Sequence, residues 1–440
     1  MLINLTEEEL KTIKNPVLRD YAQIYFRIEQ GFQDWVQQTG LELDLDLRSK
    51  TEEILQKLQA KGAIFRNDGK SIVVNQISPA CQACQKGIGS ISLFISLRCH
   101  RHCFFCFNPN QDHYEEFLKE KRNYRKELDD LYHDGRKLTQ LGLTGGEPLL
   151  HKAETLDFFQ YARTKFPHAY TRLYTSGDLL DEEILRGLQE SNLNEIRFSI
   201  KMEDPEELKD SILEKMKLAR DYIPSVMVEM PVIPGTLEEM KKLVIKLDAL
   251  GIFGINLLEF CFPLHNAEIF KEKGFKVKNP AYRVLYDYWY AGGLPVSQSE
   301  VECLELLEFI LDQHLTLGAQ YCSLENKHTA QIYQQNDHQR VTKALYFSAK
   351  DYFFKSAKVF GEDIPQVLSV FKKNRYTGYQ INQDYDYLEF HVDQIKSLAK
   401  LDLEIGISYQ VREKREDGSY LRELKLDLTT PKIFNPREDV

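Results

Sequence analysis

The stretch SISLFISLRCHRHCFFC, residues 90–106, joins an apolar run to three closely spaced cysteines. The run SISLFISL has the length and composition of a buried strand. The cysteines that follow it, Cys99, Cys103 and Cys106, have the spacing CxxxCxxC. Three thiolates can bind three irons of a [4Fe-4S] cluster and leave the fourth iron without a protein ligand. An open iron can bind and act on a small molecule, so this stretch predicts a reactive centre at the end of a strand.

Five further apolar runs follow and alternate with amphipathic helical stretches. The runs are KLTQLGLTGG (137–146), AYTRLYTSG (169–177), EIRFSIK (195–201), SVMVEMPVI (225–233) and GINLLEF (254–260). Short connections and intervening helices favour parallel strands joined by crossover helices. Six such units rather than eight predict an α/β fold with an open, partial (βα)6 barrel as its core.

Polar or glycine-rich motifs end these predicted strands. In chain order they are the cysteine triplet, Gly145-Gly146-Glu147-Pro148, Thr175-Ser176-Gly177, Ser199 with Lys201, the run PVIPGTLE (231–238), and Glu259 with Cys261. Active sites of α/β barrels gather at the carboxyl ends of the strands. This shared position predicts that the motifs form one site.

The predicted barrel covers residues 88–262, and the sequence pattern predicts three further segments outside it. Residues 1–87 are expected to form a helical segment with a hairpin turning at Asn67-Asp68-Gly69, and this segment ends in a CxxC pair. Residues 263–340 have the pattern of a helical extension. Residues 341–440 are expected to form a small α+β domain, with a hairpin turning at Glu416-Asp417-Gly418.

Composition narrows the class of protein. The chain of 440 residues is 42% hydrophobic and 28% charged, as globular proteins are. The formal net charge of −10 argues against a nucleic-acid partner. The N-terminus MLINLTEEELKTIKN has no apolar run, so no signal peptide is expected. No apolar stretch of about 18 residues predicts a membrane span, and the expected location is the cytoplasm.

The eight cysteines are clustered, which favours metal ligation in a reducing compartment over disulfides. Cys81 and Cys84 form a CxxC pair, which predicts half of a zinc or iron–sulfur site, or a redox pair. The candidates for the missing ligands are Cys322, Cys261 and Cys303, with His328 and His265 as alternatives. Cys303 shares an apolar helix face with leucines and is expected to be a buried core residue. An auxiliary cluster and a structural zinc both remain open for this possible second metal site.

Taken together, the motifs at 88–262 resemble the radical S-adenosylmethionine (SAM) superfamily. The CxxxCxxC with Phe105 before its last cysteine carries the resemblance, together with GGEP in the right strand register. The resemblance implies a [4Fe-4S] cluster whose open iron chelates SAM. It also implies reductive cleavage of SAM to a 5′-deoxyadenosyl radical that abstracts a substrate hydrogen, with flavodoxin or ferredoxin as the reductant.

The resemblance also implies roles for individual residues. Cys99, Cys103 and Cys106 would bind the cluster, and the backbone near Phe105 would approach the adenine. Gly145, Gly146 and Glu147 would meet the methionine amino group, while Ser199 and Lys201 would contact the ribose or the SAM carboxylate. The family's GxIxGxxE element corresponds to PVIPGTLE, so Ile233 and Gly235 would support the adenine. Proline replaces the first glycine of this element.

Plainer interpretations stand beside these. The triplet could instead bind zinc with His100 or His102 as fourth ligand. GGEP could be an ordinary turn, and Ser199 and Lys201 could be ordinary polar residues at a strand end.

Three functions remain open from the sequence. The first is modification of a peptide or protein side chain, favoured by the terminal units and by the aromatic-rich segment YRVLYDYWYAGG (282–293). The second is radical SAM chemistry in small-molecule or cofactor biosynthesis. The third is a non-catalytic iron–sulfur or zinc scaffold.

Overall fold

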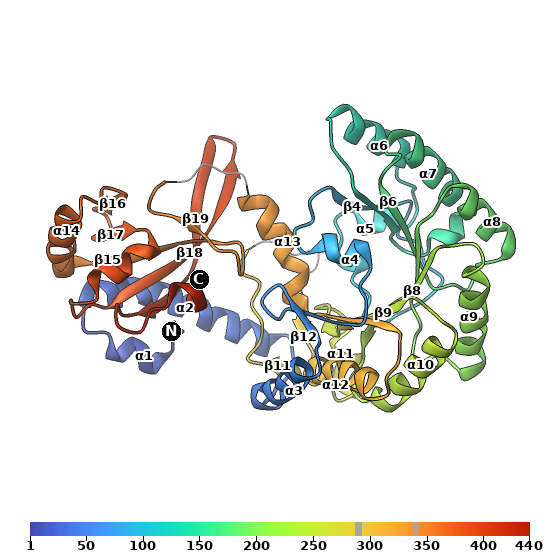
Figure 1. Cartoon of the computed structure of the whole chain (residues 1–440), viewed down its shortest axis with the longest axis horizontal. Helices are drawn as coiled ribbons and strands as arrows, with labels where there is room; N and C mark the ends of the chain where they lie inside the picture. Colours follow the sequence, from blue (N-terminus) through green and yellow to red (C-terminus); the bar gives the residue numbers. More distant parts are fainter. Residues whose placement is uncertain (287–292, 338–341) are drawn as a thin grey trace. The chain divides into compact units, whose positions relative to one another are not determined.

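The computed structural model describes residues 1–286, 293–337 and 342–440, and the chain divides into two compact units (Figure 1). One unit comprises Thr39–Tyr282 and Tyr288–Ala330. The other comprises Met1–Gln38, Arg283–Asp287 and Gln331–Val440. Half of the aromatic-rich segment, residues 287–292, lies outside the described residues.

The first unit is built on a nine-stranded sheet with the order β2-β3-β13-β9-β8-β7-β6-β5-β4. Its strands are β2 (Ile64–Arg66), β3 (Ser71–Val74), β4 (Ser90–Phe94), β5 (Gln140–Thr144), β6 (Tyr170–Thr175), β7 (Glu195–Phe198), β8 (Ser225–Val232), β9 (Gly254–Glu259) and β13 (Gly318–Cys322). The seven strands from β4 to β9 and β13 pair in parallel. The β2–β3 hairpin joins β13 in antiparallel pairing and turns where the sequence predicts.

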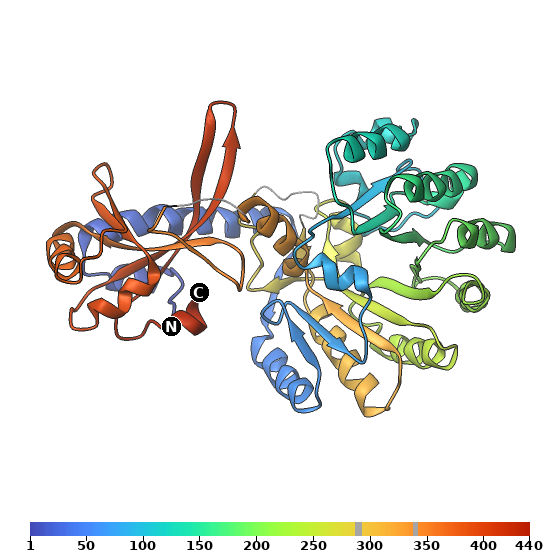
Figure 2. The same cartoon turned by 45° about the horizontal axis from the view of Figure 1, so that its top comes forward.

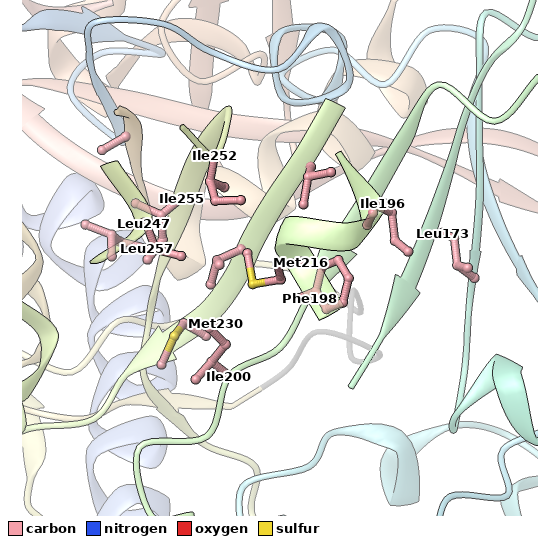
Figure 3. Packing of buried hydrophobic residues seen from close by; sticks show 14 of the residues in the cluster. Leu173, Ile196, Phe198, Ile200, Met216, Met230, Leu247, Ile252, Ile255 and Leu257 are labelled. Atoms are coloured by element: carbon pink, nitrogen blue, oxygen red, sulfur yellow. The ribbon is translucent and has the colours of Figure 1, made fainter. Parts of the chain in front are cut away.

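Helices connect the parallel strands and cover one face of the sheet (Figure 1). They are α6 (Tyr124–His133), α7 (Lys152–Lys165), α8 (Glu182–Glu190), α9 (Glu206–Ala219), α10 (Leu237–Ala249) and α12 (Ser299–Asp312), and α3 (Arg48–Ala60) packs on α12. Alternate strand residues point into this layer, and Leu173, Ile196 and Met230 lie in the resulting core (Figure 3). Burial of this apolar face against the helices stabilises the sheet.

The predicted α/β partial barrel is confirmed, and the structure adds a parallel strand to the six expected. The extra strand, β13, lies in the segment expected to be helical, and α12 is the crossover that leads to it. Its sequence GAQYC has no β-branched residue and is too short to show a pattern. Because β13 runs parallel to β9, Cys322 ends at the same edge of the sheet as the other motifs.

Short elements carry the loops at this edge. They are η1 (Asn108–Asn110), α5 (Tyr114–Phe117), η2 (Pro148–His151), β10 (Cys261–Phe262), α11 (Ala267–Glu272) and β12 (Leu294–Pro295). Another short helix, α4 (Pro79–Cys84), lies between β3 and the start of β4. Ser78 caps α4 by accepting a hydrogen bond from the Ala80 backbone, and Pro79 occupies the first helical position. After β13, the chain continues into α13 (Leu324–Asn336).

The second unit has a sheet with the order β16-β17-β15-β18-β19, and β14 pairs with β15. Its strands are β14 (Tyr346–Phe347), β15 (Phe354–Phe360), β16 (Tyr379–Asn382), β17 (Tyr387–Phe390), β18 (Ile405–Arg415) and β19 (Gly418–Thr429). Its main helices are α1 (Glu7–Thr12), α2 (Pro16–Gln38) and α14 (Ile364–Lys373). The β18–β19 hairpin, red in Figure 2, turns between Arg415 and Gly418 as expected.

The N-terminal helices group with this C-terminal sheet. Leu18 and Ala22 of α2 share a core with Phe360 and Leu426, and Ile3 pairs with Leu428. The sequence pattern does not indicate this grouping, because amphipathic helices do not specify which surface they cover. Within the described ranges, every helix is too short or too polar to cross a membrane.

Candidate functional site

The loop after β4 presents three half-buried thiols, those of Cys99, Cys103 and Cys106. The Cys106 N–H donates to the Cys103 carbonyl at 3.1 Å, and the Arg101 N–H lies 3.4 Å from the Cys99 sulfur. Burial raises the pKa of Cys99 and Cys106, and the neighbouring thiols raise it further. The three thiols therefore lie within electrostatic range of one another on one loop, called the cysteine loop here (residues 97–107).

The glycine pair after β5 packs directly against the start of the cysteine loop. The Gly146 N–H donates to the Ser96 carbonyl at 3.1 Å, and the Glu147 N–H donates to the Arg98 carbonyl at 2.9 Å. A Cβ atom on Gly146 would lie 1.9 Å from the Arg98 carbonyl oxygen, and Gly145 has a φ of +114°. Only glycines allow this approach, so GGEP is more than an ordinary turn in this fold.

Glu147 is 2% exposed, and its carboxylate faces the end of β6. It accepts hydrogen bonds from the Thr175 hydroxyl, the Ser176 hydroxyl and the Ser176 N–H, each at 2.7 Å. It also accepts one from the Leu149 N–H at 3.0 Å. The contact of Glu147 with the methionine amino group of SAM stays a prediction. Four neutral donors already occupy the carboxylate, which fixes the Thr175-Ser176-Gly177 turn.

A charged cluster ties the middle of the cysteine loop to neighbouring strand ends. Arg101 forms two hydrogen bonds to Asp178, of 2.5 and 2.7 Å, and two to Asp204, each of 3.0 Å. His100 Nε2 lies 2.7 Å from Asp178 Oδ2. Burial opposes the Asp178 charge, yet Arg101 and His100 hold the pKa of Asp178 at about 2. The loop is thereby fixed to the turns after β6 and β7.

The arrangement of the residues that the structure describes does not provide the four converging ligands that a zinc site at the cysteine triplet would need. Among the described residues, no three His, Cys, Asp or Glu side chains lie close enough to share one metal ion. His100 already binds Asp178, and His102 is exposed. A mononuclear zinc site needs ligands that converge on a single ion, whereas each thiolate of a cubane cluster binds a different iron.

The loop after β10 supports the other side of the cysteine loop. His265 Nε2 lies 2.8 Å from the Cys106 carbonyl oxygen, and Asn266 donates to the Phe104 carbonyl at 3.0 Å. Asn110 donates to the Pro263 carbonyl at 2.9 Å. Sequence reasoning missed these contacts for this role. The only signal was a pair of polar residues, His265-Asn266, a few residues after the last predicted strand.

The remaining expected SAM contacts surround the cysteine loop. The positive charge of Lys201 acts on the thiols of both Cys99 and Cys106. The Ser199 N–H donates to the Thr175 carbonyl at 3.0 Å. Phe105 is half-buried, and its ring contacts Phe260 edge to face. These positions place the polar ends of β7 and the aromatic pair of the loop around the same thiols.

The PVIPGTLE element ends β8 with a glycine that faces open space. Gly235 has a φ of +91°, and a Cβ atom there would meet nothing within 4 Å. Its N–H donates to Glu302 at 2.7 Å, and burial raises the pKa of that carboxyl. Ile233 is buried beside it. The N–H of Gly235 is thus bonded to Glu302 and, among the described residues, the space where a side chain would extend from its Cα is empty.

The four cysteines of the possible second metal site gather loosely. Cys84 and Cys81 lie within electrostatic range of Cys322, and Cys322 lies within range of Cys261. Burial raises the pKa of Cys81 to about 11 despite a 3.2 Å contact from Arg197. No three of these side chains share one ion position within the described residues. The second metal site stays a prediction.

Comparison with known proteins relates this site to one family. A sequence model of the radical SAM superfamily matches residues 93–247. A "putative glycyl-radical enzyme activating enzyme" of Methanocaldococcus jannaschii is 31% identical over 224 residues, which cover 47% of this chain and 56% of that protein. The chain thus spans about half the length of this curated relative.

Two solved structures match parts of this chain at low similarity. Streptococcus suis SuiB bound to precursor peptide SuiA is 13% identical, with a TM-score of 0.38, and the match covers 66% of this chain and 56% of SuiB. The enzyme anSMEcpe with bound AdoMet and a peptide is 16% identical, with a TM-score of 0.31, and the match covers 38% of this chain and 50% of that one. Likenesses at these TM-scores carry no weight for function.

Proposed function

Because this chain belongs to the radical SAM superfamily of enzymes, we propose that it cleaves SAM reductively at a [4Fe-4S] cluster and modifies a polypeptide substrate. Cys99, Cys103 and Cys106 would hold the cluster. The observation that carries the proposal is the cysteine loop itself, which presents three thiols and is fixed against the glycine pair Gly145-Gly146.

The donor set fits a cluster with an open iron. Three half-buried thiols come from one loop. Of the two nearby histidines, His100 contacts Asp178 and His102 is exposed to solvent. Backbone N–H groups point at two of the sulfurs, those of Cys99 and Cys106, and would stabilise their thiolates. When bound, the cluster and SAM supply the 5′-deoxyadenosyl radical that abstracts the substrate hydrogen.

The chain offers complementary groups for the amino-acid part of SAM. Gly145 and Glu147 use their carbonyl oxygens to accept hydrogen bonds from Asn108 and Leu150. Among the described residues, the Gly146 carbonyl therefore remains to accept from an ammonium group. Lys201 supplies a positive charge beside the thiols that can attract a carboxylate. We assign the positioning of this strand end to the buried Glu147.

A polypeptide substrate is favoured by the relative from Methanocaldococcus jannaschii, because a glycyl-radical enzyme activating enzyme acts on a protein. The second unit, with its own sheet, gives this chain a further surface outside the barrel. A small redox protein, flavodoxin or ferredoxin, would deliver the electron. Residues 341–440 would contribute to substrate binding.

The test uses the full chain after anaerobic reconstitution with iron and sulfide. Dithionite or flavodoxin should drive formation of 5′-deoxyadenosine and methionine from SAM, measured by liquid chromatography and mass spectrometry. Cys103→Ala should abolish both the cluster absorbance and 5′-deoxyadenosine. The matched control, Cys303→Ala, removes a thiol buried in α12 and should retain both. Product formation by Cys103→Ala would overturn the ligand assignment.

The substrate class is tested with extracts of the native host divided by size. The fraction above a 3 kDa filter should raise 5′-deoxyadenosine formation over the rate without substrate, and protease treatment of that fraction should remove the increase. An increase with only the small-molecule filtrate would instead establish the biosynthetic alternative. If the fully reconstituted and reduced protein forms no 5′-deoxyadenosine from SAM, the scaffold alternative is supported.

A further inference from the structure

The face of the sheet opposite the helices carries a row of polar residues in register. Ser92 pairs with Gly142, Gly142 with Arg172, and Arg172 with Glu195. Their chain neighbours, such as Leu93, point to the other face and belong to the core under the helices. The row therefore lies on the inner face of the partial barrel.

One cation on this face, Arg197, forms ion pairs with two carboxylates. Arg197 lies 2.6 Å from Glu195 and also forms an ion pair with Glu229. Glu195 further accepts hydrogen bonds from the hydroxyls of Ser78 and Tyr170, at 2.5 and 3.0 Å. This group of charges needs nothing more from a ligand.

Arg172, the neighbouring cation, lacks such a match. It is 7% exposed, and its Nη1 is buried without a hydrogen-bond partner in the described part of the chain. Nε donates to the Tyr174 hydroxyl at 2.9 Å and Nη2 to the Ser92 hydroxyl at 3.4 Å. Burial raises the pKa of Tyr174 to about 12, so this partner is neutral at pH 7. A buried guanidinium with only neutral partners is costly, which points to an absent anion.

The fold makes room for this guanidinium. A Cβ atom on Gly142 would lie 3.2 Å from Arg172 Nε and 2.8 Å from the Ser92 hydroxyl. Solvent reaches the same face, because Ser92 is exposed and Tyr174 is only half-buried.

Lys327 is a second cation whose charge reaches this part of the fold. Arg172 and Lys327 both act electrostatically on the Cys84 thiol, whose pKa is raised by burial although the residue as a whole is exposed. Lys327 forms no ion pair with the residues that the structure describes, and it is half-buried. The Glu229 carboxylate lies within range of the same thiol. Glu229 would repel a dianion such as phosphate more strongly than a singly charged carboxylate.

We propose that Arg172 binds a carboxylate group of the substrate on the inner face of the barrel. The guanidinium Nη1 would donate to it, and the positive charge of Lys327 would attract it from further away. This assignment rests on the proposed function and deepens it, because it gives the polypeptide substrate an acidic side chain or a free C-terminus at this position.

The binding test uses the reconstituted full chain without reductant, so it does not depend on radical chemistry. Propionate and its neutral isostere propionamide are titrated by calorimetry. Propionate should bind, propionamide should bind at least tenfold more weakly, and Arg172→Met should lose this preference. The matched control Arg186→Met, on exposed α8, should keep it. Equal binding of the two probes, or an unchanged preference in Arg172→Met, would overturn the proposal.

Three further arms make the result specific. Lys327→Met should weaken propionate binding several-fold. Tripeptides with a central Asp and an amidated end, or with only a free C-terminus, distinguish the two sources of the carboxylate by which one competes with propionate. Without carboxylate, Arg172→Met should melt at the same or a higher temperature than the wild type, because an unmatched buried charge is removed. A large fall in melting temperature would show a structural role and overturn the proposal.

Metal analysis supplies the last arm. Four irons per chain and no zinc, unchanged in Cys84→Ala, would agree with a carboxylate position beside Cys84. A further metal that disappears in Cys84→Ala would place a cation where the carboxylate should lie and would overturn the assignment. If carboxylate binding is found without SAM cleavage, the proposed function fails and the binding site stands.

Discussion

Ser176 donates two hydrogen bonds to one oxygen of Glu147, from its N–H and from its hydroxyl, each 2.7 Å long. The two residues end neighbouring parallel strands, so this contact joins the turn after β6 to the glycine pair after β5. The glycine pair in turn holds the cysteine loop through backbone hydrogen bonds. The Glu147 side chain therefore helps to position the three thiols, although it contacts none of the cysteines that the structure describes.

Glu147→Gln should destabilise the protein by about 2–3 kcal/mol, because an amide donor would face the Ser176 donors in a buried place. Chemical denaturation of the metal-free chain measures this loss. The control Glu190→Gln, on an exposed helix end, should change the unfolding free energy by less than about 0.5 kcal/mol. Equal stability of Glu147→Gln and the wild type would contradict the positioning role.

Gly146→Ala should prevent stable cluster assembly, because the added methyl would overlap the Arg98 carbonyl oxygen. Iron per chain after reconstitution and the visible absorbance of the cluster measure the effect. Gly235→Ala is the matched control. Unlike Gly146 it has a positive φ, but an added methyl there meets no atom within 4 Å, so the substitution should cost only about 1 kcal/mol in strain and retain iron. Full iron content in Gly146→Ala would refute the packing argument.

The Asp178–Arg101 contact predicts a defined pH dependence. The folded pKa of Asp178, about 2, lies below its ordinary value of 3.8. Its contribution to stability is therefore complete above about pH 5 and is lost as the pH falls from about 4 to 2. In the metal-free chain, the wild type should lose about 1–2 kcal/mol more than Asp178→Asn across this window, with solvent screening included. Parallel pH curves for the two proteins would contradict the assignment.

His265→Ala should weaken retention of iron without preventing its insertion, because one of several supports of the cysteine loop is removed. The rate of iron loss to a chelator should rise several-fold. His168→Ala removes an exposed histidine elsewhere and should leave this rate unchanged. Identical rates for all three proteins would mean that the contact with the Cys106 carbonyl does not stabilise the loop.

The sequence could predict the barrel and the placement of its motifs because both depend on local periodicity. Apolar runs of strand length and the glycines of GGEP determine their own conformation. The strand β13 escaped prediction because GAQYC derives its conformation from pairing with β9 and β3 on either side. Non-local pairing leaves no periodic trace in five residues.

Side-chain partners were less predictable than backbone positions. The Glu147 carboxylate accepts hydrogen bonds from Thr175 and Ser176, and no local pattern of the sequence indicates these partners. Within the ranges that the structure describes, Arg172 lacks a carboxylate partner because Glu195 and Glu229 both pair with Arg197. Sequence shows both arginines and the glutamates, and only the register of the strands decides that Arg197 takes Glu195 and Glu229.

The support that His265 gives to the cysteine loop spans 159 residues of chain. During synthesis the three cysteines therefore emerge long before the last group that fixes their loop. Iron that arrived early would meet three mobile thiols, whereas iron that arrives after β9 has paired meets a finished site. The long reach of this one hydrogen bond thus makes firm retention of the cluster, rather than its insertion, depend on a late step in the folding of the chain.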